Sequence, residues 1–372
     1  MTIGVLKEPQ QETRVSLLPE AVAALTKKNI SVVVERGAGL GAYAFDADYE
    51  SAGAVIKDAN EVVRSSDIIL CIHKPEVSFE ENKILIGVYQ PLFHPLQMQE
   101  WTKQKLTVFS LDMLPRTTRA QSMDILSSQA NISGYKAVVL AANMYPRYFP
   151  MFMTAAGSIP PAKMLILGAG VAGLQAIATA KRLGAVVEVF DTRPAVKEEV
   201  MSLGAKFVEV EGAADPSQAG GYAVEQTEEY KQRQQQRITE SLAKADIVIT
   251  TAQIPGKKAP VLITEEMLKQ MRSGSLIIDI AASTGGNTPF TKNNETIDYN
   301  GIRIVGSGNL PASMPSDASK VYGKNVSNFL QLITNKEAGL HLNWDDDLVK
   351  GSCITHDGEI VNERVKELSA AL

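Results

Sequence analysis

The strongest chemical signal is a glycine-rich turn between a hydrophobic run and a helical pattern. The run KMLILGAGVAG contains Gly168, Gly170 and Gly173, and also Ala169 and Val171. In a strand–turn–helix unit the first glycine permits a tight turn. The second lets the backbone approach a pyrophosphate, and the third lets the helix pack on the strand. Phosphates would lie at the helix N-terminus, where the N–H groups and the dipole favour an anion. The pattern predicts a dinucleotide-binding turn.

A carboxylate follows the next expected strand. Asp191 ends VVEVFD, eighteen residues after Gly173. An acid at this place accepts hydrogen bonds from ribose hydroxyls and repels a 2′-phosphate, which favours NAD(H) over NADP(H). Thr192 and Arg193 come next, and the arginine is a possible phosphate ligand, but Asp191 in front of it opposes that use. Without the acid, the glycines alone would fit a plain turn between strand and helix.

A second polar run, RTTRAQSMDILSS, begins at Arg116, straight after Pro115. It contains two arginines, a glutamine, an aspartate and several hydroxyls. On composition alone, the simpler interpretation is a helix N-terminus with Ser122 as its cap and the polar side chains in water.

A third feature is the stretch 211–237, EGAADPSQAGGYAVEQTEEYKQRQQQR, between two expected strands. It exceeds an ordinary connection of a few residues, and from Glu225 onward it is typical of an exposed helix. Two interpretations stay open. One is a solvated surface excursion, and the other is a mobile lid over the cofactor, with Gly220 and Gly221 as pivots beside Tyr222.

The remaining reactive side chains indicate no metal or nucleophile chemistry. The four histidines do not share metal-ligand spacing, and there is no G-x-S-x-G, no P-loop and no H-E-x-x-H. Arg14, Lys74 and His94 are candidates for a cleft wall. For each of them a structural or solvated role is the simpler expectation.

The elements that must position these residues alternate regularly along the chain. Short β-branched runs alternate with helical patterns such as Pro19–Lys28, which predicts an α/β fold of two doubly wound parallel sheets. Runs such as LIIDI, with few polar interruptions, fit central strands buried on both faces. The expected strands are 3–6, 31–35, 67–70, 84–89 and 106–112 in the first half, and 163–167, 186–191, 205–210, 246–251, 275–281 and 301–306 in the second.

A length of 372 residues suits two domains. A helix over Ser122–Tyr145 is expected to cross from the first domain to the second, and a helix after the last strand is expected to return. The tail 341–372 would then complete the first domain. We therefore predict a first domain of 1–130 with 320–372, a second domain of 131–319, and a ligand cleft between them.

Composition narrows the class further. Hydrophobic residues make up 45% and charged residues 21%, as in soluble folded proteins, and a net charge of −5 argues against nucleic-acid binding. Two cysteines rule out a disulfide framework or a cysteine-rich zinc site. Apolar runs fall short of the roughly 20 residues of a membrane span, and the N-terminus becomes charged at Lys7, unlike a secretory signal. A cytoplasmic protein without direct membrane insertion is expected.

These residues also carry a family resemblance. The runs RTTRAQSMDILSSQANISGYKAV, KMLILGAGVAGLQAIATAKRLGA and TTAQIPGKKAPVLITEEM closely resemble the soluble NAD(H)-binding components, of the alpha subunit type, of proton-translocating NAD(P) transhydrogenases. The resemblance covers essentially the whole chain. RAQSMDILSSQ is specific to those components, whereas KEP…ETRV…P is shared with alanine dehydrogenase of the same superfamily. It implies two Rossmann-like domains, the first completed by the C-terminal residues, and a homodimer.

The resemblance also implies site roles, residue by residue. Arg116, Gln121 and Asp124 match the family's polar loop, with Ser127 one turn later, and these four are its expected catalytic residues around the nicotinamide, its ribose and the pyrophosphate. Gly220, Gly221 and Tyr222 match its mobile loop. At the Gln253 position some relatives have Leu, so a backbone contact is expected there, while QPLFHPLQ at 90–97 departs from the family. The expected cofactor contacts are Arg116, Thr117, Thr118, Arg119, Gln121, Asp124, Gly168, Ala169, Gly170, Val171, Gly173, Asp191, Thr192, Arg193, Gly221, Tyr222, Gln234 and Gln253.

The activity that the resemblance implies needs other chains. Hydride would pass between NADH on this chain and NADP+ on a partner component, with Si/Re specificity, coupled to proton translocation by membrane-spanning subunits. Because the chain ends at Leu372 without a span, the NADP(H) site and the proton channel are expected on those partners. The chain would then lie in the cytoplasm, peripherally associated with the inner membrane.

Two alternatives come from other classes. An alanine dehydrogenase-like enzyme needs an acid/base group and a carboxylate anchor, and Arg14, Lys74 and His94 match that family's substrate positions. That family has an Asp two residues before a Gly-Gly, in DIAIDQGG, whereas DIAASTGG has Ser283 there. Exchange of hydride between two nicotinamides moves no substrate proton, so this loss is harmless to it. The other alternative is a non-catalytic NAD-sensing module.

Overall fold

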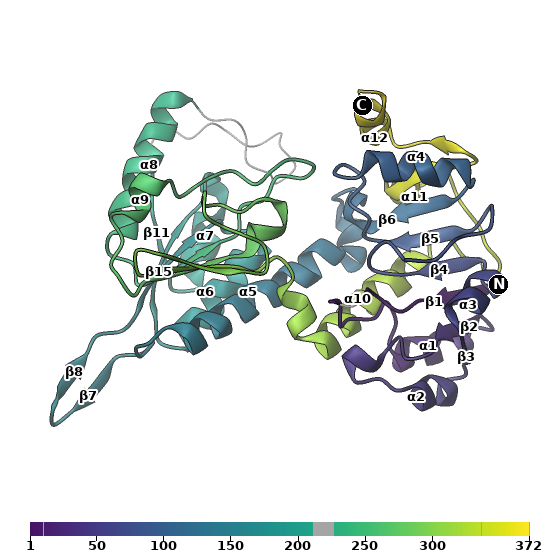
Figure 1. Cartoon of the computed structure of the whole chain (residues 1–372), viewed down its shortest axis with the longest axis horizontal. Helices are drawn as coiled ribbons and strands as arrows, with labels where there is room; N and C mark the ends of the chain where they lie inside the picture. The colour runs from purple at the N-terminus through teal and green to yellow at the C-terminus, as the bar shows by residue number, and fades with distance from the viewer. Residues whose placement is uncertain (10, 211–226, 336, 372) are drawn as a thin grey trace. The chain divides into compact units, whose positions relative to one another are not determined.

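The computed structural model describes residues 1–9, 11–210, 227–335 and 337–371. The chain forms two compact units. Unit 1 consists of Met1–Gln129 and Pro311–Leu372, and unit 2 of Ala130–Leu310. Each unit is built on one large sheet with helices on both faces (Figure 1). No helix in the described part of the chain is both long enough and apolar enough to span a bilayer.

The sheet of unit 1 runs in the order β17-β16-β6-β5-β4-β1-β2-β3. The six strands from β6 to β3 are parallel, and their order is that of a doubly wound dinucleotide-binding sheet. At one edge, β16 and β17 are antiparallel. The strands are β1 Thr2–Val5, β2 Ser31–Glu35, β3 Val55–Lys57, β4 Ile68–Leu70, β5 Ile84–Gly87, β6 Thr107–Ser110, β16 Cys353–His356 and β17 Glu359–Ile360.

Helices cover both faces of this sheet because side chains alternate along each strand. Ile68 and Leu70 join the core beneath α1 and α10, whereas Ile69 joins the core beneath α3 and α4. Both cores are apolar, as expected for a parallel sheet buried on two sides. The helices of unit 1 are α1 Pro19–Thr26, α2 Asp46–Ser51, α3 Ala59–Ser65, α4 Pro95–Lys103, α10 Pro315–Leu330, α11 Asp347–Ser352 and α12 Glu363–Ala370.

The sheet of unit 2 repeats the same strand order, β11-β10-β9-β12-β13-β15-β14. All neighbours are parallel except β14, which pairs antiparallel with β15 at the edge. The strands are β9 Lys163–Leu167, β10 Val186–Phe190, β11 Lys206–Phe207, β12 Ile247–Thr250, β13 Leu276–Asp279, β14 Thr296–Tyr299 and β15 Ile302–Gly306.

In unit 2 the alternation again builds two cores. Ile166 packs with α5, α6 and α7, while Leu165 and Leu167 pack with α8 and α9. The helices are α5 Ile125–Met144, which begins in unit 1, α6 Val171–Arg182, α7 Lys197–Ser202, α8 Glu228–Leu242 and α9 Glu265–Leu268. At Gly134 a Cβ atom would overlap the carbonyl group of Ala172, so α5 and α6 cross in backbone contact.

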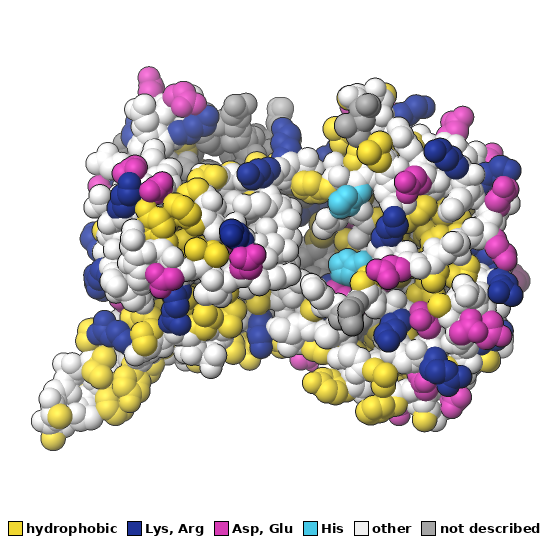
Figure 2. All heavy atoms as spheres, viewed as in Figure 1, with side chains coloured by type: hydrophobic (Ala, Val, Ile, Leu, Met, Phe, Trp, Pro, Cys, Tyr) yellow, Lys and Arg dark blue, Asp and Glu magenta, His cyan; other side chains and the backbone are white. Residues whose placement is uncertain are grey.

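An antiparallel hairpin of β7 Phe152–Thr154 and β8 Gly157–Ile159 projects from unit 2 (Figure 1). Met151, Phe152 and Met153 on it are 62%, 41% and 73% exposed, so the hairpin carries apolar side chains into solvent. The stacked rings of Tyr148 and Phe152 lie at its base, with centroids 4.9 Å apart. Figure 2 shows this hydrophobic surface along the hairpin.

The α/β, doubly wound fold class predicted from the sequence is confirmed, with differences in detail. The strand expected over 205–210 is reduced to β11, and the sheets are not wholly parallel, because β14, β16 and β17 are antiparallel at the edges. The hairpin was not predicted, since its short apolar runs lie between prolines. The expected helix over Ser122–Tyr145 begins at Ile125, because Thr118–Met123 form a separate 3-10 turn, η3.

Candidate dinucleotide-binding site

The glycine turn of unit 2 connects β9 to α6 at the carboxyl end of the central strand. Gly168 has φ +106°, a conformation that residues with a Cβ rarely adopt, and its N–H donates to the Phe190 carbonyl at 2.8 Å. Chain direction reverses there and α6 starts at Val171. Since β12 follows on the other side of β9, the turn lies where the strand order reverses, which is where doubly wound sheets bind ligands.

The second and third glycines have opposite surroundings. A Cβ at Gly173 would overlap the Gly168 carbonyl oxygen, so helix and strand touch through backbone atoms. A Cβ at Gly170 would meet no atom of the described residues within 4 Å. Gly173 is therefore explained by packing in the protein itself. The open space above Gly170 fits a bound pyrophosphate, because the first-turn N–H groups of a helix have no partner within the helix.

Asp191 follows β10 and lies against the glycine turn. Its Oδ2 accepts a hydrogen bond from the Ala169 N–H at 2.7 Å, and its side chain is 7% exposed. Arg193 folds back onto the same carboxylate, donating from Nε to Oδ1 at 2.9 Å and from Nη2 to Oδ2 at 2.8 Å. These bonds raise the pKa of the Arg193 guanidinium. The acid and the turn are thus brought together, with Thr192 between the two charged residues.

Two buried residues that sequence reasoning missed hold the loops beside the turn. Asn287 is fully buried, and its side-chain oxygen accepts from the Ala252 N–H at 3.1 Å while its nitrogen donates to the carbonyls of Ala252 and Pro260. Asp279, also fully buried, accepts from the backbone N–H of Ala281 at 3.0 Å and of Asn287 at 2.6 Å. For Asp279 the sequence did carry a signal, because a carboxylate in the otherwise apolar run LIIDI predicts a buried polar role.

The other residues of unit 2 that were expected to contact the cofactor are Gln253, Gln234 and those of the 220–222 segment. Gln253 lies in the loop that Asn287 holds, exposed at the carboxyl end of β12, and its Nε2 donates to the Ile280 carbonyl at 3.5 Å. Gln234 is half-buried on α8. Gly220, Gly221 and Tyr222 lie outside the described residues, so the lid hypothesis for 211–237 stays a prediction.

The polar run that begins at Arg116 follows β6, at the carboxyl edge of the sheet of unit 1. Its backbone is anchored by buried Ala120 and Met123, and the Thr117 hydroxyl accepts from the Ala120 N–H at 3.3 Å. The Ser122 carbonyl accepts hydrogen bonds from Asn325 and Asn328 of α10. The run is therefore a turn anchored to the core of unit 1 and to α10.

The polar side chains of Asp124 and Arg119 bond to other residues of the chain. Asp124, and not Ser122 as composition suggested, caps α5, since it accepts from the Ser127 N–H at 2.9 Å and the Ser127 hydroxyl at 2.6 Å. Arg119 donates to Asp346 at 2.6 Å and also contacts Asp347. The exposed side chains on the turn include those of Arg116, Thr117, Thr118, Arg119 and Gln121. Their roles toward a cofactor stay predictions.

The substrate positions of an amino-acid dehydrogenase differ in environment. Arg14 is buried and bound to Glu12, Lys74 donates to Gln97, and His94 is exposed just before α4. Ser283 is exposed in the 3-10 turn after β13. Within 1–9, 11–210, 227–335 and 337–371, no three His, Cys, Asp or Glu side chains gather as metal ligands.

A buried carboxyl holds the loop after β4 in the same way as Asp279 holds its loop. The oxygens of Glu8 accept from the N–H groups of Ile72 at 2.5 Å and His73 at 3.0 Å. Burial raises the pKa of Glu8 to about 7, and the two backbone hydrogen bonds oppose this rise. Glu8 is thus protonated in part near neutral pH.

Two doubly wound units, one with a glycine turn and a strand-end acid against it, define a two-unit α/β protein of the dinucleotide-binding class. Comparison of the sequence with known families gives a match to "Alanine dehydrogenase/PNT, N-terminal domain" over residues 4–133 and to "Alanine dehydrogenase/PNT, C-terminal domain" over residues 137–363. The chain belongs to this alanine dehydrogenase/PNT family.

Individual relatives refine the similarity. An NAD(P) transhydrogenase subunit alpha chain of Rhodospirillum rubrum is 44% identical over 97% of this chain and 98% of its own length. The crystal structure of transhydrogenase from Sinorhizobium meliloti has a TM-score of 0.88 at 42% identity, covering 97% of this chain and 100% of that one. An alanine dehydrogenase of Staphylococcus epidermidis is 27% identical over 99% and 96% of the two chains. The resemblance drawn from the sequence is confirmed.

The two glycines give the first prediction. Gly173→Ala should lower the free energy of unfolding by about 1–3 kcal/mol, because its methyl group overlaps a backbone carbonyl. Gly170→Ala should leave stability nearly unchanged and weaken NADH binding at least about tenfold, roughly 1.4 kcal/mol, since the methyl occupies the space predicted for the pyrophosphate. Urea unfolding and isothermal titration calorimetry separate the two effects. Equal NADH affinity in Gly170→Ala would contradict the placement.

Glu8 gives a prediction about pH. Since its pKa is raised from 4.5 to about 7 in the folded protein, its contribution to stability is complete below pH 4.5 and is lost as the pH rises through 7. The unfolding free energy of the natural protein minus that of Glu8→Gln should therefore fall by about 3 kcal/mol between pH 4.5 and 7.5. Urea unfolding of both proteins across this range measures it. A difference that rises with pH would show that Glu8 is ionised throughout.

Proposed function

We propose that this chain is the NAD(H)-binding component of a proton-translocating NAD(P) transhydrogenase. It binds NAD(H) on unit 2 and passes hydride between NADH and NADP+, which a partner component holds. Membrane-spanning subunits couple the exchange to proton translocation. The exchange is of the Si/Re-specific type.

The observation that carries the proposal is the arrangement of the glycine turn and Asp191. The open space above Gly170 receives the pyrophosphate, and the Asp191 carboxylate, held against the turn by the Ala169 N–H, receives the ribose hydroxyls. The bound nicotinamide supplies the hydride chemistry. The chain's own task is to bind, orient and keep water away from the reacting ring.

The polar run of unit 1 supplies the positioning groups. Gln121 lies on a turn whose backbone is anchored by the buried neighbours Ala120 and Met123, and its own side chain is exposed, which leaves its amide open to a ligand. Asp124 and Ser127 are hydrogen-bonded to each other at the start of α5, which gives the turn a second anchor. Such a rigid turn suits the orientation of a nicotinamide ribose, for which small displacements are costly.

Amino-acid oxidation is the weaker alternative. It requires a group that moves a proton at the reacting carbon and a free anchor for a carboxylate. Ser283 stands where alanine dehydrogenase has an aspartate, and Arg14 is bound to Glu12 and Gln129. Hydride exchange between two nicotinamides needs neither group. The stronger full-length similarity to transhydrogenase alpha subunits supports the same choice.

The partners follow from this function. An NADP(H)-binding component must dock where the nicotinamide is presented, and membrane-spanning subunits must accompany it, which places the chain in the cytoplasm beside the inner membrane. A homodimer is part of the proposal. The exposed apolar side chains of the β7–β8 hairpin support it, because a second copy would cover them.

Cofactor choice is the first test of the proposal. Because the Asp191 carboxylate repels a 2′-phosphate, the chain should bind NADH at least about tenfold more tightly than NADPH, roughly 1.4 kcal/mol. Asp191→Ser should remove most of this preference, since it also releases Arg193 to bind the phosphate. Asp345→Ala, an exposed change of equal charge in unit 1, is the matched control. If calorimetry finds equal affinities of the natural protein for NADH and NADPH, the assignment of this chain as the NAD(H)-binding component is wrong.

Gln121 tests the reaction itself. Gln121→Asn keeps the amide and shortens its reach by one methylene, and a displacement of about 1 Å at a reacting centre costs on the order of 100-fold in rate. Hydride transfer to an added NADP(H)-binding component should fall accordingly in stopped flow, while NADH affinity changes far less. Unaltered transfer would remove Gln121 from the site.

Further assays separate the alternatives. Asn143→Ala, an exposed change on α5, is the control and should transfer hydride at the natural rate. L-Alanine oxidation by the isolated chain should be absent, and robust turnover would favour the amino-acid dehydrogenase. NADH binding without transfer to any NADP(H) component would favour the sensing module.

A further inference from the structure

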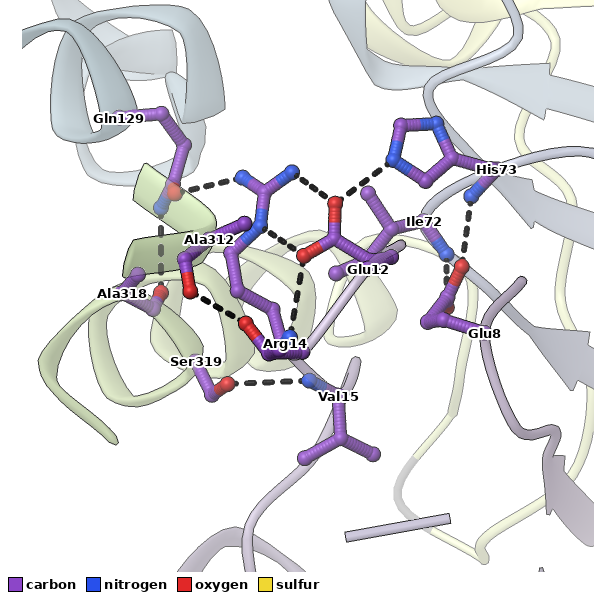
Figure 3. Close-up of polar contacts among 11 residues, drawn as sticks. Glu8, Glu12, Arg14, Val15, Ile72, His73, Gln129, Ala312, Ala318 and Ser319 are labelled. Atoms are coloured by element: carbon purple, nitrogen blue, oxygen red, sulfur yellow. Dashed lines mark hydrogen bonds and ion pairs between the residues drawn. The ribbon is translucent and has the colours of Figure 1, made fainter. Parts of the chain in front are cut away.

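One short segment of unit 1 is bonded at both places where the chain passes between the units. The chain leaves unit 1 after Gln129 and returns to it at Pro311. Residues 12–15, between β1 and α1, lie against both of these places, and Figure 3 shows their contacts. All the partners described below belong to unit 1.

The returning segment of chain is held by two hydrogen bonds. The Thr13 hydroxyl donates to the carbonyl of Ala312, two residues after the chain leaves unit 2. The Val15 N–H donates to the Ser319 hydroxyl at 3.0 Å, in the first half of α10. Gly41 closes on Thr13 from the other side, since a Cβ there would come within 2.6 Å of the Thr13 carbonyl oxygen.

The departing segment of chain is held through one arginine. Arg14 Nη1 donates to the Gln129 side-chain oxygen at 2.8 Å, and Gln129 Nε2 donates in turn to the Ala318 carbonyl at 3.1 Å. Gln129 lies on α5 and Ala318 on α10, so these hydrogen bonds join the two helices close to the places where the chain passes between the units (Figure 3).

The arginine is itself fixed by a buried ion pair. The Glu12 carboxylate accepts hydrogen bonds from Arg14 Nε at 2.8 Å and from Arg14 Nη2 at 2.6 Å. It also lies 2.8 Å from Nε2 of the His73 ring. The side chains of Glu12 and Arg14 are 3% and 7% exposed. Two-point binding of a guanidinium in a buried site fixes its orientation, so Arg14 cannot follow Gln129 freely if α5 moves.

We propose that residues 12–15 are a hinge clamp, which holds both crossing segments in one arrangement and so limits the positions that unit 2 takes relative to unit 1. Covalent connections alone would leave two pivots that bend independently. The clamp couples them, because α5 and α10 are bonded through Gln129 and both are bonded to the same segment. Arg14 is then a positioning residue. It acts on the reaction through Gln129 and not on a ligand.

The clamp has a consequence for hydride transfer that rests on the proposed function. Gln129 is five residues after Asp124 on the helix that begins at the polar turn, and Gly168 and Asp191 lie in the other unit. A loosened hinge would spread the positions of these two sets of groups. It should slow transfer while leaving the affinity of unit 2 for NADH unchanged.

The experiment measures the distribution of distances between a label in unit 1 and a label in unit 2. Spin labels are attached at Asn60→Cys on α3 and Gln235→Cys on α8, both exposed and one in each unit. The natural cysteines, Cys71 and Cys353, are buried and burial raises the pKa of both thiols, so they react slowly. Labelled chains are diluted into unlabelled protein, and pulsed electron resonance gives the distance distribution.

The test variant is Thr13→Val with Gln129→Met. It removes the Thr13–Ala312 bond and the Arg14–Gln129–Ala318 bonds, and it keeps the Val15–Ser319 bond and the Glu12–Arg14 ion pair. Its distribution should be broader than that of the natural protein, and its hydride transfer about tenfold slower at unchanged NADH affinity. Gln129→Glu keeps an acceptor for Arg14 but has no donor for the Ala318 carbonyl, so its distribution should lie between those of the natural protein and the test variant. The control is Thr26→Val with Gln331→Met, which removes the Thr26–Ala52 and Gln331–Ser327 hydrogen bonds and none of those that residues 12–15 make.

The outcomes separate the two proposals. Equal widths in the test variant, the control and the natural protein overturn the clamp. A broader distribution in the test variant, together with no hydride transfer in the natural protein, supports the clamp and overturns the transhydrogenase function. If the double variant does not fold, the single changes Thr13→Val and Gln129→Met give the same comparison.

Discussion

The backbone contact between α6 and β9 at Gly173 is the constraint on which the nucleotide-binding unit depends. Because the helix touches the Gly168 carbonyl, its first turn stands directly over the strand end, and the loop from β10 can bring Asp191 to the same point. A larger residue would push the helix away, and both the helix end predicted to bind the pyrophosphate and the acid would lose their common position.

A second theme is the use of buried polar side chains to hold loops at the carboxyl edges of the sheets. Glu8 does this after β4, and Asp279 and Asn287 do it after β13 and β12. Each satisfies backbone groups that a buried loop would otherwise leave unpaired, which is costly. The loops are thereby held, while neighbours such as Gln253 stay exposed.

The proposed chemistry explains why rigidity matters more here than acid–base groups. Hydride exchange between two nicotinamides moves no substrate proton, so its rate depends on how the two rings are placed. The clamp of residues 12–15 contributes to placement through bonds among unit 1 residues alone. This view also gives Arg14 and Glu12 a use that does not require a substrate carboxylate.

The sequence by itself determined the fold class, the glycine turn and the strand-end acid. These are local patterns, in which a strand, three glycines and a helix follow one another and the next strand ends in Asp191. Family resemblance supplied the expected role of Gln121, which neither spacing nor hydropathy indicates. Only the tertiary structure decided that Asp124 caps α5, that Arg193 folds onto Asp191, and that Asn287 holds the loop of Gln253. The clamp also belongs here, because it joins residues 115 and 304 positions apart in the chain. Such pairings depend on how sheet and helices pack, which no local pattern records.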